Sequence, residues 1–557
     1  MGRRSRSAAC VRKPLTVAAV SWQAVASVVD VSTPLYLISF IYVCRVACLD
    51  QVTQEFAWRI RHTRRTPLAM FTLPAFLAQC CKAAMDVVTG VPLTVGYAIQ
   101  PYWTERNIFA FALFMSWLTY LWETYLSYRQ YKVCKSTPRV PSELSVITDQ
   151  ETFSKARLYQ IDKMKFGFCS GIWSELETTV VLLFGGFAFF WHLCEKLAAK
   201  AGAEHNELVV TSLFIFGGSL LSTLLDLPWS IYYTFVIEER HGFNKQTPGF
   251  FAKDRVKKFF LMQAVVLPIS CGIVQIIKMG GDYFFIYLWF FTLIVSVLIS
   301  FIYSDYIAPL LDKFTPLPEG NLKTKIEELA ASIHFPLKKL LVVEGSKRSS
   351  HSNAYFFGLF KEKKIVLFDT LFEKEELTEG ENGTVSGEED AAKDKALPEK
   401  KTHKKTGCND DEILGVLAHE LGHWKLSHVI KNFVIGQVHL FFCFMIFSLL
   451  YTDEQAYRAF GFYNSKPIFI GLMLIFMYIF SPYNTLVDFL MTALSRHFEF
   501  QADAFARGMH RASYLRSALI KLNRDNLSFP VYDWLYSTWH HSHPPVLERV
   551  RALGKVD

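Results

Sequence analysis

Charged residues are scarce in this chain. Asp, Glu, Lys and Arg make up 20% of its 557 residues, whereas hydrophobic residues make up 51% and aromatic residues 15%. The formal net charge of +8 is small for this length, and Lys and Arg lie mostly at the ends of apolar runs. A nucleic-acid-binding protein would gather these residues on one folded face, so no nucleic-acid partner is expected. The eleven cysteines include no C-x-x-C pair, which excludes a dense disulfide framework and predicts reduced, mostly buried thiols.

Long apolar runs are what the chain has instead. Runs of about 18 or more apolar residues are typical of membrane-spanning helices. Seven such runs occur, near Ile108–Leu126, Leu176–Leu193, Leu208–Leu225, Phe259–Ile277, Tyr283–Tyr303, Phe433–Tyr451 and Pro467–Leu486. They predict a mostly α-helical membrane protein with seven transmembrane helices.

The segments between the runs alternate in their content of basic residues. The segment after the first run is rich in Lys and Arg, the second has only Lys196 and Lys200, and the third is basic again. Since Lys and Arg favour the cytosolic side of a membrane, the odd-numbered segments and the C-terminus are predicted to be cytosolic. Glu123 and Glu177, at or inside the ends of runs, either face a cavity or mark boundaries drawn too generously.

This pattern divides the chain into five segments. Residues 107–305 hold the first five transmembrane helices, and residues 431–490 hold the sixth and seventh. Residues 306–430 form a cytosolic domain with a charged, disordered insert at 373–411, and residues 491–557 add a helical part to that domain. Residues 1–106 are an N-terminal extension, which is either an extra span or a leader, with Met85 as an alternative start.

Three short apolar segments predict a small β-sheet in the cytosolic domain. They are Lys339–Gly345, Asn353–Phe360 and Lys364–Leu371, and the K-E-K between the last two is typical of a tight connection. After the insert, Asn409, Asp410 and Asp411 are possible N-caps of a helix that continues as E-I-L-G-V-L-A-H-E-L-G-H-W.

That helix carries an H-E-x-x-H motif. His419 and His423 are four residues apart, so on a helix they share one face and can bind one zinc ion. In such sites the glutamate between them, here Glu420, is not a ligand but takes a proton from the metal-bound water. The pentapeptide also occurs by chance, so a further ligand has to be found.

A glutamate from a later helix is the best candidate for the third ligand. In S-R-H-F-E-F-Q-A-D-A-F-A, Glu499 would bind zinc, and Asp503 on the same face would hydrogen-bond the far nitrogen of a ligand histidine. The alternative is a pair of carboxylates on a helix surface. His428 is predicted to face away as a surface or capping histidine, and His497, a rival ligand, lies on another face.

Several long motifs resemble one known family. They are VLAHELGHWKLSH, LSRHFEFQADAFA, EGSKRSSHSNAYFFG, FVIEERHGFN, DYIAPLLDKFTPLPEG and HSHPPVLERV. Together they are similar to the type I CAAX prenyl proteases, M48-family zinc metallopeptidases of the endoplasmic reticulum and inner nuclear membrane. The resemblance runs from about Asn107 to the C-terminus and is greatest to the animal members that process prelamin A. It implies seven helices in a hollow barrel around a large chamber, closed by a gluzincin-like zinc domain at the membrane face.

The resemblance also implies roles for particular residues. His419, His423 and Glu499 match the ligands of one zinc ion per chain, and Glu420 matches the catalytic base. His543 matches a histidine that steadies the oxyanion, and Arg549 matches an arginine that braces the site. Asn353 and Ala354 match the edge strand that holds the substrate backbone. Without the resemblance, His543 would be an ordinary surface histidine.

The implied activity is removal of the C-terminal aaX tripeptide from prenylated CAAX proteins, prelamin A among them. The expected partners are such substrates and the lipid bilayer, and the protease domain is expected to face the cytosol and nucleoplasm. Two alternatives stay open. One is a quality-control metalloprotease for misfolded or translocon-stuck proteins, which would use the same zinc site. The other is a seven-span receptor or channel in which the H-E-x-x-H motif is accidental.

Overall fold

The computed structural model describes most of the chain after residue 99. Within residues 100–554 it leaves out 146, 205, 348, 350, 352, 358–362 and 377–403. The predictions about residues 1–99 of the N-terminal extension therefore lie outside the described residues. The fold described here is that of the remaining part, which includes every residue expected at the site.

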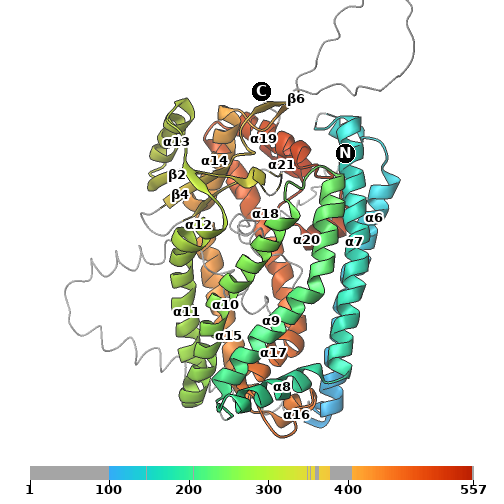
Figure 1. Ribbon diagram of the computed structural model, residues 1–557. Coiled ribbons are helices and arrows are strands. Elements are labelled where there is room, and N and C mark those ends of the chain that lie inside the picture. Colours follow the sequence, from blue (N-terminus) through green and yellow to red (C-terminus); the bar gives the residue numbers. More distant parts are fainter. Residues whose placement is uncertain are drawn as a thin grey trace, which may run out of the picture.

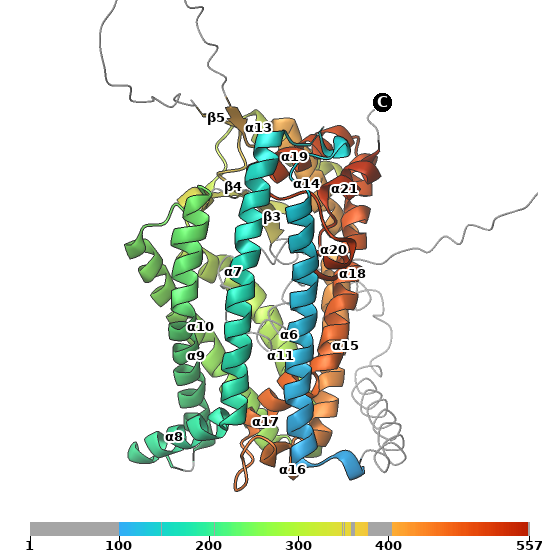
Figure 2. The ribbon, with the colours of Figure 1, turned by 90° about the vertical axis from the view of Figure 1, so that its right-hand side faces the viewer.

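Long helices form the body of the molecule and lie alongside one another in both views (Figures 1 and 2). They are α6 (Glu105–Ser136), α7 (Gln150–Leu183), α9 (Glu207–Tyr232), α10 (Pro248–Met279), α11 (Phe284–Ile302), α15 (His428–Leu450) and α18 (Ser481–Gly508). Their outward faces are apolar. On α11, for example, Tyr287, Phe290, Ile294 and Leu298 are exposed at helical spacing. Large exposed apolar stripes of this kind fit contact with lipid rather than water.

Four helical segments of the described chain are long and apolar enough to cross a membrane. They are Glu207–Glu238, Pro248–Met279, Gly281–Ile302 and His428–Leu450, and two bent helix pairs could raise the number to six. The helix α6 is not among them. The molecule is thus a mostly helical membrane protein, while the number of seven spans and the chamber remain predictions.

Two predicted spans do not run straight. The predicted span at Leu176–Leu193 contains a bend of 66° between α7 and α8 (Gly186–Lys200), so a single span there would be a broken one. Gly185, with φ of 62°, ends α7 in the left-handed conformation that glycine adopts without strain. The run Pro467–Leu486 contains a second bend of 64°, between residues 479 and 481. Apolar composition continues through both corners, so it gives no sign of the change in direction.

A four-stranded mixed sheet lies at one end of the helices (Figure 1). Its order is β1 (Phe314–Pro316), β2 (Leu337–Val343), β4 (Lys363–Phe368) and β3 (Ala354–Phe357). The hairpin expected from the sequence is confirmed, since β3 pairs antiparallel with β4. The strand β2 pairs with β4 instead, in parallel, and this leaves β3 at the edge of the sheet. Residues 361 and 362 of the K-E-K connection lie outside the described residues, and its last lysine, Lys363, begins β4.

The ends of the predicted insert are ordered, so its predicted disorder over all of 373–411 is wrong. Strand β5 (Lys374–Glu376) pairs antiparallel with β6 (Lys404–Thr406), and the buried Cys408 continues the contact as a bridge to Phe372. Main-chain hydrogen bonds hold such a ladder together whatever its side chains are, so a charged sequence does not forbid it. Residues 377–403 of the insert lie outside the described residues.

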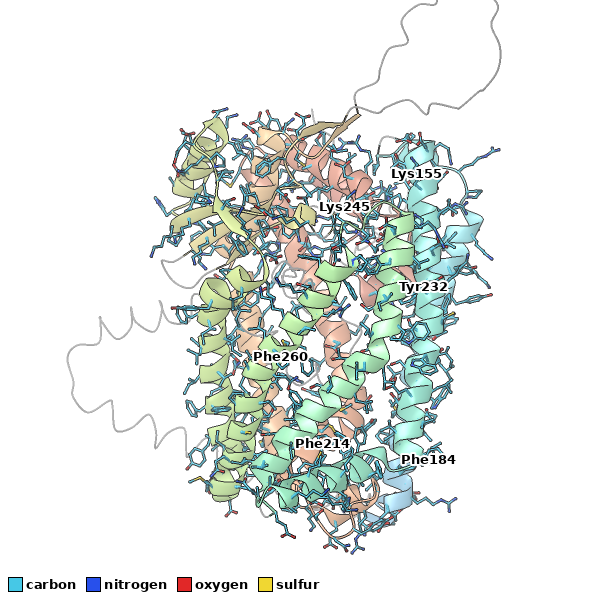
Figure 3. All side chains as sticks on the ribbon, in the orientation of Figure 1. Lys155, Phe184, Phe214, Tyr232, Lys245 and Phe260 are labelled. Carbon is cyan, nitrogen blue, oxygen red and sulfur yellow. The ribbon has the colours of Figure 1, made fainter. Side chains whose placement is uncertain are left out.

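The labelled side chains in Figure 3 show at which end of the helices two of the basic segments lie. In Figure 3, Lys155 and Lys245 lie at the end that carries the sheet, Phe260 lies midway, and Phe184 lies at the opposite end. Lys245 belongs to the short segment that joins η3 (Tyr233–Glu238), the π-helical extension of α9, to α10. The short basic segments therefore share an end with the sheet.

Candidate metal centre

The predicted H-E-x-x-H helix is α14 (Asp410–Lys425), and its start is as expected. Asn409 caps it with a capping box, in which its side chain accepts from the Glu412 N–H while the Glu412 carboxylate accepts from the Asn409 N–H. Every residue from Glu412 to His423 is buried. This helix is therefore inside the domain, and its polar residues need partners there.

Two glycines allow α14 to pack closely against its neighbours. A Cβ at Gly415 would lie 2.6 Å from the backbone nitrogen of Leu515 in α19 (Ala512–Asp525). A Cβ at Gly422 would lie 3.1 Å from Cβ of Phe505 in α18. The second contact sets the distance between the helix that carries both motif histidines and the helix that carries Glu499.

The three predicted ligands converge in the structure. Nε2 of His419 and Nε2 of His423 lie 3.1 Å apart, and they lie 3.5 and 3.4 Å from the Glu499 carboxylate oxygens. Ligands of a tetrahedral zinc ion at bond lengths of 2.0–2.1 Å would be about 3.3 Å apart. The side chains of His419, His423 and Glu499 are 5%, 1% and 0% exposed. These three ligands would therefore bind a metal without contact with bulk water themselves.

The Glu499 carboxylate supports a cation at this point. The carboxylate is fully buried, and neither oxygen accepts a hydrogen bond of good geometry from the described residues. The cationic groups of Arg549 and His543 approach only Oε2, so a cation between Glu499 and the two imidazoles would compensate the rest of this buried charge. Two neutral imidazole nitrogens and one carboxylate are a donor set that suits zinc. The residues present therefore fit the predicted metal.

Asp503 and Arg549 lie behind one of the histidines. Oδ1 of Asp503 is 2.8 Å from Nδ1 of His419, so the far ring nitrogen of that histidine has the partner expected for it. Arg549 donates to both oxygens of Asp503, at 3.0 Å from Nε and 2.7 Å from Nη2. Its Nη1 also lies 3.3 Å from Oε2 of Glu499. The arginine thus links Glu499 and Asp503 on α18.

Glu420 and His543 complete the group of residues that the sequence predicted at the centre. Glu420 is buried, its Oε2 has no hydrogen-bond donor among the described residues, and burial raises the pKa of its carboxyl to about 7. A carboxyl with such a pKa can both take and return a proton near neutral pH. His543 is 36% exposed, and its Nδ1 lies 2.9 Å from Oε2 of Glu499. This contact between His543 and the third ligand did not follow from the sequence.

The prediction that His428 is a surface or capping histidine is wrong. Its ring is fully buried, with Nδ1 3.0 Å from Nδ1 of His423 and Nε2 2.9 Å from Oε1 of Gln501. The helix α14 ends at Lys425, and Ser427 adopts a left-handed φ of 58° before α15 begins. Counting 100° per residue from His423 therefore gives the wrong direction. His497, the rival ligand, contacts Gln501 and is not part of the metal-ligand group.

The edge strand β3 packs against α14 and so lies beside the centre. Ala354 begins it and is buried. The carbonyl of Asn353 accepts from the Phe368 N–H at 3.1 Å, and its side-chain oxygen accepts from the Ala354 N–H at 2.8 Å. Asn353 and Ala354 are thereby fixed relative to the rest of the sheet.

Two family profiles match the chain in consecutive parts. The profile described as "CAAX prenyl protease N-terminal, five membrane helices" matches residues 130–313, and "Peptidase family M48" matches residues 316–557. The chain belongs to peptidase family M48. It is a metalloprotease, and the resemblance drawn from the sequence motifs is confirmed.

Individual members of the M48 family are similar over most of the chain. The CAAX prenyl protease 1 homolog of Mus musculus is 55% identical over 81% of this chain and 96% of its own length. The CAAX prenyl protease 1 of Saccharomyces cerevisiae is 37% identical over 78% of this chain and 92% of its own length. The crystal structure of S. mikatae Ste24p has a TM-score of 0.69 and 35% identity, covering 80% of this chain and 99% of that one.

Proposed function

We propose that this M48 protease is a zinc metalloendopeptidase that removes the C-terminal aaX tripeptide from prenylated CAAX proteins, with prelamin A among its substrates. The observation that carries the proposal is the convergence of His419, His423 and Glu499 next to the buried Glu420. The similarity to CAAX prenyl proteases from animals and yeast supplies the substrate class.

His419, His423 and Glu499 would hold the zinc ion. When bound, zinc polarises the substrate carbonyl and lowers the pKa of water enough to supply a nucleophile near pH 7. Glu420 accepts the proton of the attacking water and passes it to the leaving amine. His543, at the exposed side, donates to the oxyanion that forms on the carbonyl. Arg549 and Asp503 hold His419 and Glu499 in place.

The edge strand β3 would hold the substrate as an added strand. A peptide that pairs with Asn353 and Ala354 is bound through main-chain hydrogen bonds, which work for varied sequences. The same strand packs against the motif helix α14. A peptide bound along it therefore passes close to Glu420.

The domain division and location belong to the same proposal. Residues 107–305 and 431–490 would provide seven spans around a water-filled chamber, because hydrolysis at membrane depth needs water. The protease parts at 306–430 and 491–557 would face the cytosol and nucleoplasm from the endoplasmic reticulum and inner nuclear membranes. Lys155 and Lys245, at the end that carries the sheet, favour that orientation (Figure 3).

The decisive assay uses a farnesylated CAAX peptide and the purified chain. We expect release of the aaX tripeptide, loss of release with a chelator, and recovery when zinc is added back. The same peptide without its prenyl group is the matched control and should be cleaved far more slowly. Equal cleavage of both peptides would favour quality-control proteolysis, and cleavage that resists exhaustive chelation would overturn the zinc mechanism.

A further inference from the structure

A line of hydrogen-bonding side chains leads away from His423, on the side opposite the metal centre. Nδ1 of His423 faces Nδ1 of His428 at 3.0 Å, and Nε2 of His428 faces Oε1 of Gln501 at 2.9 Å. Nε2 of Gln501 in turn lies 3.1 Å from Nε2 of His497. The line joins α14, α15 and α18, and it was not predicted from the sequence.

Each contact in this line needs one donor and one acceptor. A neutral imidazole donates from one nitrogen and accepts at the other, and an amide donates only from its nitrogen. The line could run in two directions, one for each orientation of the Gln501 amide. With Oε1 towards His428 and Nε2 towards His497, as in this structure, every proton points from His423 towards His497.

Only one direction suits a metal ligand. If His423 donates from Nδ1, its Nε2 carries a lone pair, and that nitrogen faces His419 and Glu499. If the direction is reversed, Nε2 carries the proton and cannot bind zinc. The Gln501 oxygen selects the productive direction because it can only accept, which obliges His428 to donate from Nε2 and to accept at Nδ1.

We propose that His428 and Gln501 are positioning residues that fix the ring and tautomer of the ligand His423. The inference rests on the zinc site of the proposed function. It gives each histidine ligand its own support, since Asp503 and Arg549 already hold His419. Such partners of a metal ligand typically change metal affinity by 10–100-fold.

Packing holds the His428 ring in the orientation that this role needs. The ring is 0% exposed and stacks on Phe498, with centroids 3.6 Å apart and planes 3° from parallel. The Lys431 ammonium lies 5.2 Å from the centroid of the same phenyl ring. A ring stacked in this way keeps Nδ1 directed at His423.

The test measures zinc affinity by competition with a chromophoric chelator, together with the visible spectrum of the cobalt-substituted protein. His428→Phe keeps a stacking ring but removes the acceptor, so zinc affinity should fall 10–100-fold and the cobalt bands should shift. His428→Asn, which keeps an acceptor near the Nδ1 position, should recover part of that loss. His439→Phe removes another buried histidine of α15, one that contacts Tyr483, and should leave zinc affinity unchanged.

Gln501 provides a comparison that does not depend on the His428 variants folding. Gln501→Glu keeps an acceptor for His428 and should hold zinc as tightly as the parent. Gln501→Met has a similar shape but cannot accept, so zinc affinity should fall about tenfold while unfolding without metal is unchanged. A purely structural role predicts the opposite order, since the methionine would be tolerated better than a new charge.

The outcomes separate this inference from the proposed function. If the parent binds no zinc, the proposed function fails. If the parent binds zinc and His428→Phe or Gln501→Met matches it within twofold, the positioning role is wrong and the zinc site stands.

Discussion

Arg549 is predicted to be the main compensation for the buried carboxylates behind the metal centre. Its side chain is 9% exposed and donates two charge-assisted hydrogen bonds to Asp503, at 2.7 and 3.0 Å. Hydrogen bonds to charged groups contribute about 1.5–3 kcal/mol each. Removing one partner of a buried ion pair costs about 3–5 kcal/mol. Arg549→Met should therefore lower the free energy of unfolding of the metal-free protein by about 3–5 kcal/mol.

A double-mutant cycle with Asp503→Asn tests the origin of that loss. Unfolding in denaturant is compared for the parent, both single variants and the double variant in one detergent. The double variant should be more stable than Arg549→Met, because it no longer buries the Asp503 charge alone. Arg551→Met, at an exposed position two residues on, should change stability by no more than about 0.5 kcal/mol. A loss below about 1 kcal/mol for Arg549→Met, or no recovery in the double variant, would refute the reasoning.

Three further predictions concern the centre itself. Glu420→Gln should keep its zinc, measured by metal analysis, while cleavage of the farnesylated peptide falls about 10²–10⁴-fold, and full activity would contradict its role as base. Burial and Arg549 lower the pKa of metal-free His419, but the neighbouring carboxylates of Asp503 and Glu499 outweigh them and raise it to about 9. Zinc binding at pH 7.5 should therefore release a proton in calorimetry, and affinity should rise with pH up to that pKa, whereas pH-independent affinity would argue against this. Gly422→Ala should separate α14 from α18 and weaken zinc binding, while Gly508→Ala, with open space around its Cβ, should not; equal affinities would show that the close approach is unimportant.

The parts of the site that the sequence predicted are those that follow from helical periodicity. His419 and His423 on one helix, and Glu499 and Asp503 on another, are each four residues apart, so each pair shares a face. The structure brings the two faces together. The edge position of β3 followed from the family resemblance, because strand order depends on pairing between segments that are distant in the chain.

The parts that the sequence did not predict depend on breaks in that periodicity. The direction of His428 is set by the left-handed Ser427, a conformation that is uncommon for serine. Gln501 lies between Glu499 and Asp503 in the sequence, and no motif or spacing marks it as a partner of a histidine. The corner at Gly185 falls inside an apolar run, where hydropathy alone predicts a straight span.

Zinc content per chain tests the central claim most directly. The purified parent should contain one zinc ion per chain, and Glu499→Gln should lose it on dialysis against a weak chelator. Glu548→Gln, which changes a half-exposed carboxylate that pairs with Arg496, is the matched control and should retain zinc. A parent without zinc, or a Glu499→Gln variant that holds zinc as firmly as the control, would contradict a centre built from two imidazoles and this carboxylate.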